Sequence, residues 1–494
     1  MPVDYVSGVK FGIASYVACN IVLFVSELVL TDEERARAGE RLVTLLERYE
    51  RDLPETPVLP EPDRDRLAEL LADSLPEKGI GVDGLFDRIE DTIVANSATV
   101  AHSRFLAYVL GPPNGIAAYT EAIAATINQN CNFWQLSPAA SVVERSVLEW
   151  LASVVEFPAS AKGILTGGGS LATLQALATA LNDRVPGFRG TGLQRPGPPL
   201  VVYTSVEAHR SVDKAAAILG IGVDHVRHIA TDEENRLDVA ALTAAIEADR
   251  AAGRQPWCVV ATCGTVATGA VDPLEAIADL CAEQELWLHV DGAYGGLFLL
   301  CNEMRELMAG CARADSISLD PHKLLFAPLE AGCLLVRDGT KLRAAFAFDS
   351  SYLTVADDPL LTDYMDYGPQ LSRNFKALKV WSALQAFGVE AFRATTRRTL
   401  ELAQYFARGI EAIPGLTLLA PVTLTAVCFA VDGASPAEQT TLLETLAAEN
   451  TALLGPVLIN GKHGLRACIT NHRTTAADID LILARLQDVA AGRG

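Results

Sequence analysis

The sequence predicts an α/β protein built on a mostly parallel β-sheet. Short apolar runs typical of buried strands lie at residues 163–165, 200–203, 257–262, 286–290, 316–319 and 333–336. Helical segments, such as 170–181 and 273–283, separate most of these runs. Strands that alternate with helices form βαβ units, so we expect a sheet that is covered by helices on both faces.

The composition narrows the classes of function. Among 494 residues, 40 are Lys or Arg and 61 are Asp or Glu, which gives a net charge of -21. This charge repels a phosphate backbone, so we expect no nucleic-acid partner. The ten cysteines include no C-x-x-C pair and no tight cluster. Their scatter argues against a disulfide framework or a metal site and favours a reducing compartment, the cytoplasm.

The chain begins with an apolar extension, residues 1–30. Its stretch 11–30 is almost wholly apolar, although polar residues such as Asn20 and Glu27 interrupt it. A membrane span needs about 20 apolar residues, and this stretch only just reaches that length. A start-site extension or packed helix, a signal anchor and a signal peptide remain open alternatives. Membrane association is expected only if the stretch 11–30 is an anchor.

Three further parts follow the extension. A Thr-x-x-Glu capping box at Thr31 and Glu34 begins the first of several helices. The alternation of strands and helices then continues until a long helix at 375–387, and a helix at 476–489 ends the chain. We therefore expect a helical N-terminal segment (31–114), a large α/β domain (115–375) and a small C-terminal α+β domain (376–494).

Two of the strand-like runs end in groups that can ionise. Asp291 follows the run at 286–290, and the triplet Pro-His-Lys that ends in Lys323 follows the run at 316–319. Ligands bind beyond the carboxyl ends of strands in an open α/β sheet, so these two side chains can meet in one crevice. A lysine amine can hold an aldehyde cofactor covalently, and a carboxylate can keep a pyridine nitrogen protonated. This pair is what a protein contributes in pyridoxal-phosphate (PLP) enzymes.

A glycine-rich turn, Thr166-Gly-Gly-Gly-Ser170, leads from a strand into a helix. Glycines let backbone N–H groups approach an anion closely, and the start of a helix favours negative charge. Ala172 stands where a glycine would complete either G-x-G-x-x-G or G-x-S-x-G. The turn therefore favours an anion site over a dinucleotide fold or a hydrolase nucleophile elbow.

Together these motifs resemble those of the group II pyridoxal-phosphate-dependent decarboxylases, the relatives of aromatic-L-amino-acid and glutamate decarboxylases. The similarity extends from about Thr31 to the C-terminus. It implies the aspartate-aminotransferase-like (type I) fold and PLP as the cofactor. In this family the lysine of Pro-His-Lys carries the cofactor, which corresponds to Lys323. The aspartate of His-Val-Asp-x-Ala-Tyr pairs with the pyridine nitrogen, which corresponds to Asp291.

The resemblance also implies a set of cofactor contacts. His209, in Ala-His-x-Ser-Val, corresponds to the histidine that stacks on the cofactor ring beside the substrate carboxylate. Val266 stands where many members have a second threonine of the Gly-Thr turn. The remaining implied contacts to the cofactor ring, its phosphate or the covalent bond are Gly169, Ser170, Thr265, Ala293, Ser316 and His322.

Tyr352 bears on the class of reaction. It lies in a stretch with poor helical periodicity and several aspartates, a composition typical of a mobile loop. In the family, a Tyr-Leu pair at this distance after the lysine lies on a loop that closes over the site, usually the neighbouring subunit's. The tyrosine returns a proton to the α-carbon after CO2 leaves. The resemblance thus implies a catalytic role for Tyr352 and a homodimer with shared active sites.

The residues expected to contact the substrate match the family pattern less well than those expected to contact the cofactor. Tyr108 corresponds to a family tyrosine of the side-chain pocket, but Val109-Leu110 follows it where animal aromatic decarboxylases have Phe-Pro. Asn130 and Asn132 stand where aromatic members carry apolar side chains. Arg373 matches a family arginine near the site, and a structural ion pair is an equal alternative.

We therefore expect decarboxylation of an L-amino acid to the amine and CO2, with an aromatic substrate slightly favoured. Another type I reaction, such as transamination or oxidative decarboxylation to an aldehyde, remains an alternative. A PLP-binding protein without catalytic activity is a second alternative.

Overall fold

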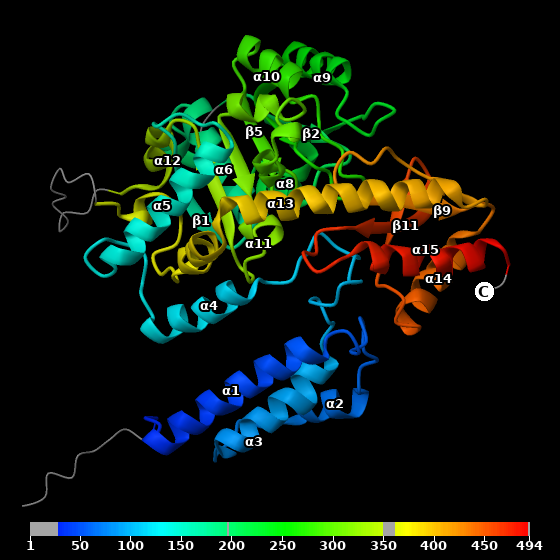
Figure 1. Ribbon diagram of the computed structural model, residues 1–494. Coiled ribbons are helices and arrows are strands. Elements are labelled where there is room, and N and C mark those ends of the chain that lie inside the picture. The colour runs from blue at the N-terminus through cyan, green and yellow to red at the C-terminus, as the bar shows by residue number, and fades with distance from the viewer. Residues whose placement is uncertain (1–27, 195–196, 349–360, 493–494) are drawn as a thin grey trace, which may run out of the picture. The chain divides into compact units, whose positions relative to one another are not determined.

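Figure 1 shows the computed structural model, which describes residues 28–194, 197–348 and 361–492. The chain forms two compact units. Unit 1 comprises Met1–Asp52 and Glu61–Ser97, and unit 2 comprises Leu53–Pro60 and Ala98–Gly494. The boundaries at 114 and 375 that we expected from the sequence stay predictions. Across the described ranges, no helix combines the length and apolar character that a membrane crossing requires.

Unit 1 is helical. It contains α1 (Asp32–Asp52), α2 (Arg64–Ala72), α3 (Gly81–Arg88) and the short helical turns η1 (Ile89–Ile93) and η2 (Val94–Asn96). The capping box forms as expected, because Glu34 N donates to Thr31 Oγ1 at 3.2 Å and Thr31 N donates to Glu34 Oε2 at 2.9 Å. None of these helices buries a side chain fully. Of the apolar run 11–30, only residues 28–30 are described, and all three are exposed.

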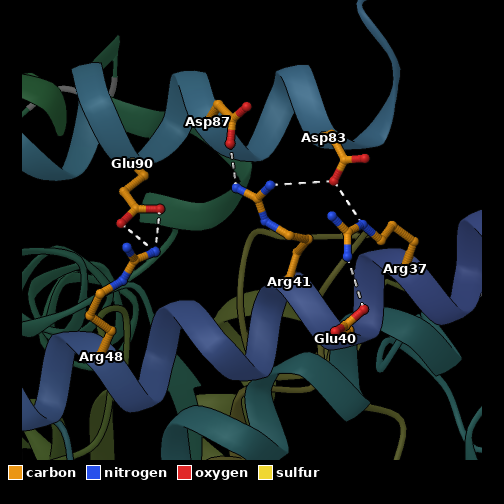
Figure 2. Close-up of polar contacts among 7 residues, drawn as sticks. All are labelled: Arg37, Glu40, Arg41, Arg48, Asp83, Asp87 and Glu90. Atoms are coloured by element: carbon orange, nitrogen blue, oxygen red, sulfur yellow. Dashed lines mark hydrogen bonds and ion pairs between the residues drawn. The ribbon is translucent and has the colours of Figure 1, made fainter.

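A row of ion pairs joins α1 to α3 and η1 (Figure 2). Arg37 Nε lies 2.8 Å from Asp83 Oδ1, and Arg41 NH2 lies 2.6 Å from Asp87 Oδ1. Arg48 pairs with the carboxylate of Glu90. These side chains are mostly exposed, so each ion pair adds little to stability.

The seven-stranded sheet is the centre of unit 2. Its strands are β1 (Lys162–Thr166), β2 (Leu200–Ser205), β3 (Val226–Ile229), β4 (Gln255–Thr262), β5 (Trp287–Gly292), β6 (Ser316–Leu319) and β7 (Gly332–Val336). The spatial order is β1-β7-β6-β5-β4-β2-β3. Neighbours from β3 to β6 pair in parallel, and β7 is antiparallel to both β6 and β1. The expected mostly parallel sheet is confirmed, with β3 as a strand that the sequence did not predict.

Helices cover both faces of this sheet. Every residue of β2, β5, β6 and β7 is buried, and side chains alternate between the two faces of a strand, so neither face is open to water. The helix α6 packs along β4 to β7, and α9 and α10 pack against strands β3 to β5. The helices of this part are α4 (Gly115–Ile127), α5 (Pro138–Val154), α6 (Gly169–Arg184), α7 (Phe188–Thr191), α8 (Ser211–Ile218), α9 (Val239–Ala251), α10 (Leu274–Glu283), α11 (Pro321–Leu324) and α12 (Gly339–Phe346).

The long helix α13 (Lys376–Ala412) leads to a second sheet, as Figure 1 shows in orange and red. It is longer than predicted because the chain continues helically beyond a kink at Gly388, whose φ of 72° suits a residue without a Cβ. The antiparallel sheet has the order β10 (Gly455–Ile459), β11 (Lys462–Cys468), β9 (Ala426–Val431) and β8 (Leu416–Leu418). The helices α14 (Pro436–Ala448) and α15 (Ala476–Ala490) accompany it.

Candidate active site

A cavity of about 280 Å³ lies where β4, β5 and β6 end. This is the edge at which a parallel sheet presents its ligand sites. Seven of the residues to which the resemblance assigns a role line it, from four separate segments: Gly169, Ser170, His209, Asp291, Ala293, His322 and Lys323. Val266, which stands in place of a family threonine, lines it as well.

Asp291 is held by two donors. Ser318 Oγ donates to Asp291 Oδ1 at 3.0 Å, and the backbone N–H of Ala293 donates to the same oxygen at 3.1 Å. The pairing of β5 with β6 sets Asp291 opposite Ser318, so the fold itself supplies the first donor. The carboxylate is 8% exposed and faces the cavity, where it can pair with a cationic ring nitrogen.

The glycine turn forms a cradle at the start of α6. Gly168 has a φ of 123°, which side-chain-bearing residues rarely adopt. A Cβ added to Gly169 would lie 2.8 Å from the Cβ of Ala293, so only glycine lets the turn pack against this wall. The first N–H groups of α6 and Ser170 therefore border the cavity, an arrangement that suits a phosphate group.

Lys323 enters the cavity from α11, beside His322 and Asp320. Its Nζ lies 2.9 Å from Asp320 Oδ2. The Nδ1–H of His322 donates to the carbonyl oxygen of Ala331 at 2.8 Å, which fixes the ring orientation. Burial lowers the pKa of His322 below its ordinary value, so its imidazole is neutral near pH 7.

His209 lies between β2 and α8. The backbone N–H of Ser211 donates to His209 Nδ1 at 3.2 Å, so the ring proton is assigned to Nε2. The residue lines the cavity and is exposed. A ring in this place can stack on a planar cofactor or touch a substrate group.

Two of the implied cofactor contacts lie inside the protein core. Thr265 is fully buried, and its Oγ1 bonds to Thr268 Oγ1 at 2.9 Å within its own turn. Ser316 is also fully buried, and its Oγ accepts from Trp287 Nε1 and bonds to His289 Nδ1, both at 2.9 Å. Neither residue lines the cavity described above.

The substrate-side residues also lie away from this cavity. Arg373 forms a buried ion pair with Glu144 and donates to the carbonyl oxygens of Cys131 and Leu165. Asn130 Oδ1 accepts from the backbone N–H of Arg373 at 3.0 Å.

Asn132 Oδ1 accepts from the backbone N–H of Phe133 at 2.9 Å. Tyr108 is 59% exposed. Tyr352 falls outside the described residues.

The sequence patterns assigned no role to several other residues of the cavity. They are Thr262, Gly264, Tyr294, Asp320 and Leu329, whereas Gly167 and Gly168 belong to the predicted glycine-rich turn. Asp320 directly precedes the Pro-His-Lys triplet, so its position beside Lys323 was the one usable signal. Thr262 ends β4, and the end of a central strand was the corresponding signal there.

The cavity has the polar groups that a phosphorylated pyridine aldehyde requires. Among the described residues that line the cavity, Thr262 carries a hydroxyl oxygen, Oγ1, that is buried without a hydrogen-bond partner and can bond to a ligand. With a lysine amine, a held carboxylate and a glycine cradle on its walls, the cavity fits PLP.

Comparisons with known proteins agree with this chemistry. A family model described as "Pyridoxal-dependent decarboxylase conserved domain" matches residues 64–432. The chain is 32% identical over 472 residues to an aromatic-L-amino-acid decarboxylase of Bacillus atrophaeus, which covers 94% of this chain and 97% of that protein. It is 34% identical to an L-2,4-diaminobutyrate decarboxylase of Rhizobium meliloti (strain 1021), with 85% and 84% covered. A crystal structure of Oryza sativa TDC with PLP and tryptamine matches with a TM-score of 0.88 and 26% identity, over 94% of this chain and 99% of that one.

Proposed function

This chain belongs to the pyridoxal-dependent decarboxylase family, and we propose that it converts an aromatic L-amino acid to the amine and CO2. Membership makes it a PLP-dependent carboxy-lyase that acts on an amino acid. The observation that carries the proposal is the meeting of Lys323, Asp291 and His209 on one cavity.

We propose a role in the reaction for five residues of the cavity. When bound, PLP supplies an aldehyde for covalent attachment of amines and a ring that withdraws electrons from the bond to be broken. Lys323 holds the cofactor and yields its place to the substrate amine. Asp291, held by Ser318, keeps a proton on the ring nitrogen. His209 orients the substrate carboxylate, and Gly169 and Ser170 bind the phosphate.

Tyr352 is proposed as the group that returns a proton to the α-carbon. This role rests on the sequence pattern alone, since Tyr352 falls outside the described residues. The backbone after this segment is anchored: Asp363 accepts from the N–H of Trp134 at 2.8 Å, and the N–H of Met365 donates to the carbonyl oxygen of Asn132 at 2.8 Å.

The aromatic preference has two supports. The relative from Bacillus atrophaeus, which spans nearly the whole chain, is an aromatic-L-amino-acid decarboxylase, and the rice structure contains tryptamine. The relative from Rhizobium meliloti is a diaminobutyrate decarboxylase, so a polar amino acid is the competing substrate class.

We also propose that the enzyme is a homodimer. One face of α4 carries an exposed apolar stripe formed by Ile116, Tyr119, Ile123 and Ile127, the last two 53% and 46% exposed. Residues spaced in this way lie on one side of a helix, and an apolar stripe of this kind favours burial against a second copy.

A cytoplasmic location is proposed as well. Nine cysteines among the described residues are buried as free thiols, a state that suits a reducing compartment.

The test of the proposed function is a screen for amine release. Purified enzyme with PLP is incubated with each L-amino acid, and amine, CO2, keto acid, aldehyde and ammonia are quantified. Amine and CO2 in equal amounts from aromatic substrates support the proposal. A keto acid would indicate transamination, an aldehyde would indicate oxidative decarboxylation, and preference for diaminobutyrate would overturn the aromatic assignment.

A further inference from the structure

Asp320 is a cavity residue to which the proposed chemistry assigns no role. It lies between β6 and α11, and its side chain is 3% exposed. Its Oδ2 is 2.9 Å from Lys323 Nζ, and its Oδ1 has no hydrogen-bond partner among the described residues. A Cβ added to Gly169 would lie 3.2 Å from Oδ2 and 3.6 Å from Oδ1, so the carboxylate also faces the start of α6.

Lys323 is the cation that balances this carboxylate. The other basic side chain near it is His322, whose Nε2 lies 3.6 Å from Asp320 Oδ2. Burial lowers the pKa of His322, so the ring is neutral at neutral pH. Among the described residues, no other cation forms an ion pair with Asp320.

We infer that Asp320 is the positioning residue that holds the amine of Lys323 whenever the lysine does not carry the cofactor. The inference rests on the proposed role of Lys323. It adds a competition between two partners for one amine, the carboxylate of Asp320 and the cofactor aldehyde.

The competition follows from the chemistry of the bond. The lone pair of Lys323 Nζ forms the bond to the aldehyde carbon, and one water leaves. An ammonium group has no free lone pair, so the lysine must leave Asp320 and give one proton to solvent before it reacts. When the substrate amine takes the cofactor, Lys323 leaves as a neutral amine, takes one proton from solvent and returns to the carboxylate as an ammonium group. Asp320 thus favours release of the lysine during turnover.

The variant Asp320→Asn keeps the shape of the side chain and removes its charge. Lys323 should then prefer the cofactor, and PLP should bind roughly tenfold more tightly than to the native chain. The analogue 4-deoxypyridoxine 5′-phosphate has the ring and phosphate but no aldehyde, so it cannot react with the lysine. The affinity of Asp320→Asn for this analogue should rise much less than its affinity for PLP. The small rise reflects only the loss of repulsion between the carboxylate and the phosphate.

The experiment measures dissociation constants of PLP and the analogue for the full-length apoenzyme by absorbance and fluorescence. Glu121→Gln is the matched control, because Glu121 pairs with the buried Lys379 at 3.2 Å and does not line the cavity. That control should change neither dissociation constant. Thermal unfolding of each variant shows that the fold is retained.

Steady-state kinetics distinguish a residue that holds the amine of Lys323 from one that only supports the fold. In Asp320→Asn, the free lysine competes better with the substrate amine, so KM should rise severalfold while kcat changes less. Equal gains for PLP and the analogue, or no gain for either, would overturn the inference.

Borohydride reduction and peptide mapping test the proposed function separately. Label on another lysine would overturn both the role of Lys323 and that of Asp320. Label on Lys323 with equal gains for the two probes would overturn Asp320 alone.

Discussion

A single oxygen of Asp291 receives both donors described above, the Ser318 hydroxyl and the Ala293 N–H. Because the proposed chemistry depends on the charge of this carboxylate, Asp291→Ala should lower kcat at least about 100-fold while the fold survives. Ser318→Ala removes one donor and leaves the carboxylate, so its loss should be much smaller. Steady-state kinetics and thermal unfolding of both variants check this order. Near-normal turnover in Asp291→Ala would remove the residue from its proposed role.

Tyr352→Phe tests the proposed proton donor. The change keeps the aromatic ring and removes only the hydroxyl, so CO2 release should persist while return of the proton slows. Reaction with oxygen should then divert product from amine toward aldehyde and ammonia. The measurement is the ratio of amine to aldehyde in air. A tyrosine that only packs would leave both the ratio and the rate unchanged.

At the scale of elements, the turn before α6 depends on the absence of a side chain. Gly169→Ala would bring its Cβ to 2.8 Å from Ala293, so the turn or β5 must shift. We expect PLP to bind about tenfold or more weakly. Gly190→Ala is the control, because a Cβ there meets nothing within 4 Å. Equal PLP affinities for the two variants would show that the cradle does not depend on this close approach.

Six strands of the large sheet were predicted from the sequence to within a few residues, because buried strands read as apolar runs. The strand β3 was missed because Arg227 and His228 interrupt its apolar pattern. The long α13 was cut short in the prediction, since a glycine in a helical pattern usually signals an end.

The meeting of Asp291 and Lys323 in one cavity was also predictable, because strand ends share an edge. The sequence did not predict which side chains of the neighbouring strands contact these two residues. Ser316 and Ser318 lie on the same face of β6. The pairing of β5 with β6 places Ser318 opposite Asp291, whereas Ser316 lies opposite His289, two residues earlier in β5. This register depends on contacts between segments far apart in the sequence, which a local pattern does not contain.

At the scale of the whole molecule, His289 couples stability to pH. Burial lowers its pKa to about 4, whereas the unfolded chain keeps the ordinary value near 6.5. At a pH between these two values, His289 is protonated in the unfolded chain and neutral in the folded chain. Its contribution to the free energy of unfolding therefore falls as the pH falls from 6.5 toward 4.

The variant His289→Gln removes this proton linkage. Relative to the native chain, it should gain about 1.4 kcal/mol in free energy of unfolding for each pH unit between 6.5 and the folded-state pKa of about 4. Urea unfolding of the apoenzyme at pH 7.5 and 5.5 measures the difference. His463→Gln, at an exposed position, is the control for the chemical change itself. A pH-independent difference for His289→Gln would contradict the linkage.

The proposed dimer predicts the mass of the particle. Light scattering should give twice 52.7 kDa for the native chain. Ile123→Glu places a charge in the apolar stripe of α4 and should shift the mass toward 52.7 kDa. Leu458→Glu, at an apolar residue of β10 that is 56% exposed, should leave the mass unchanged. Equal masses for all three proteins would exclude this stripe as the interface.

The antiparallel pairing of β1 with β7 has a consequence for the order of assembly during synthesis. Lys162 pairs with Val336, and Thr166 pairs with Gly332. The segment that leads into the glycine turn before α6 therefore gains its strand partner only after residue 336 has left the ribosome. Closing so large a loop is slow, and an unpaired strand edge is exposed in the meantime. The nascent chain thus has a long interval in which chaperones can bind, and this turn reaches its final position among the last parts of the sheet.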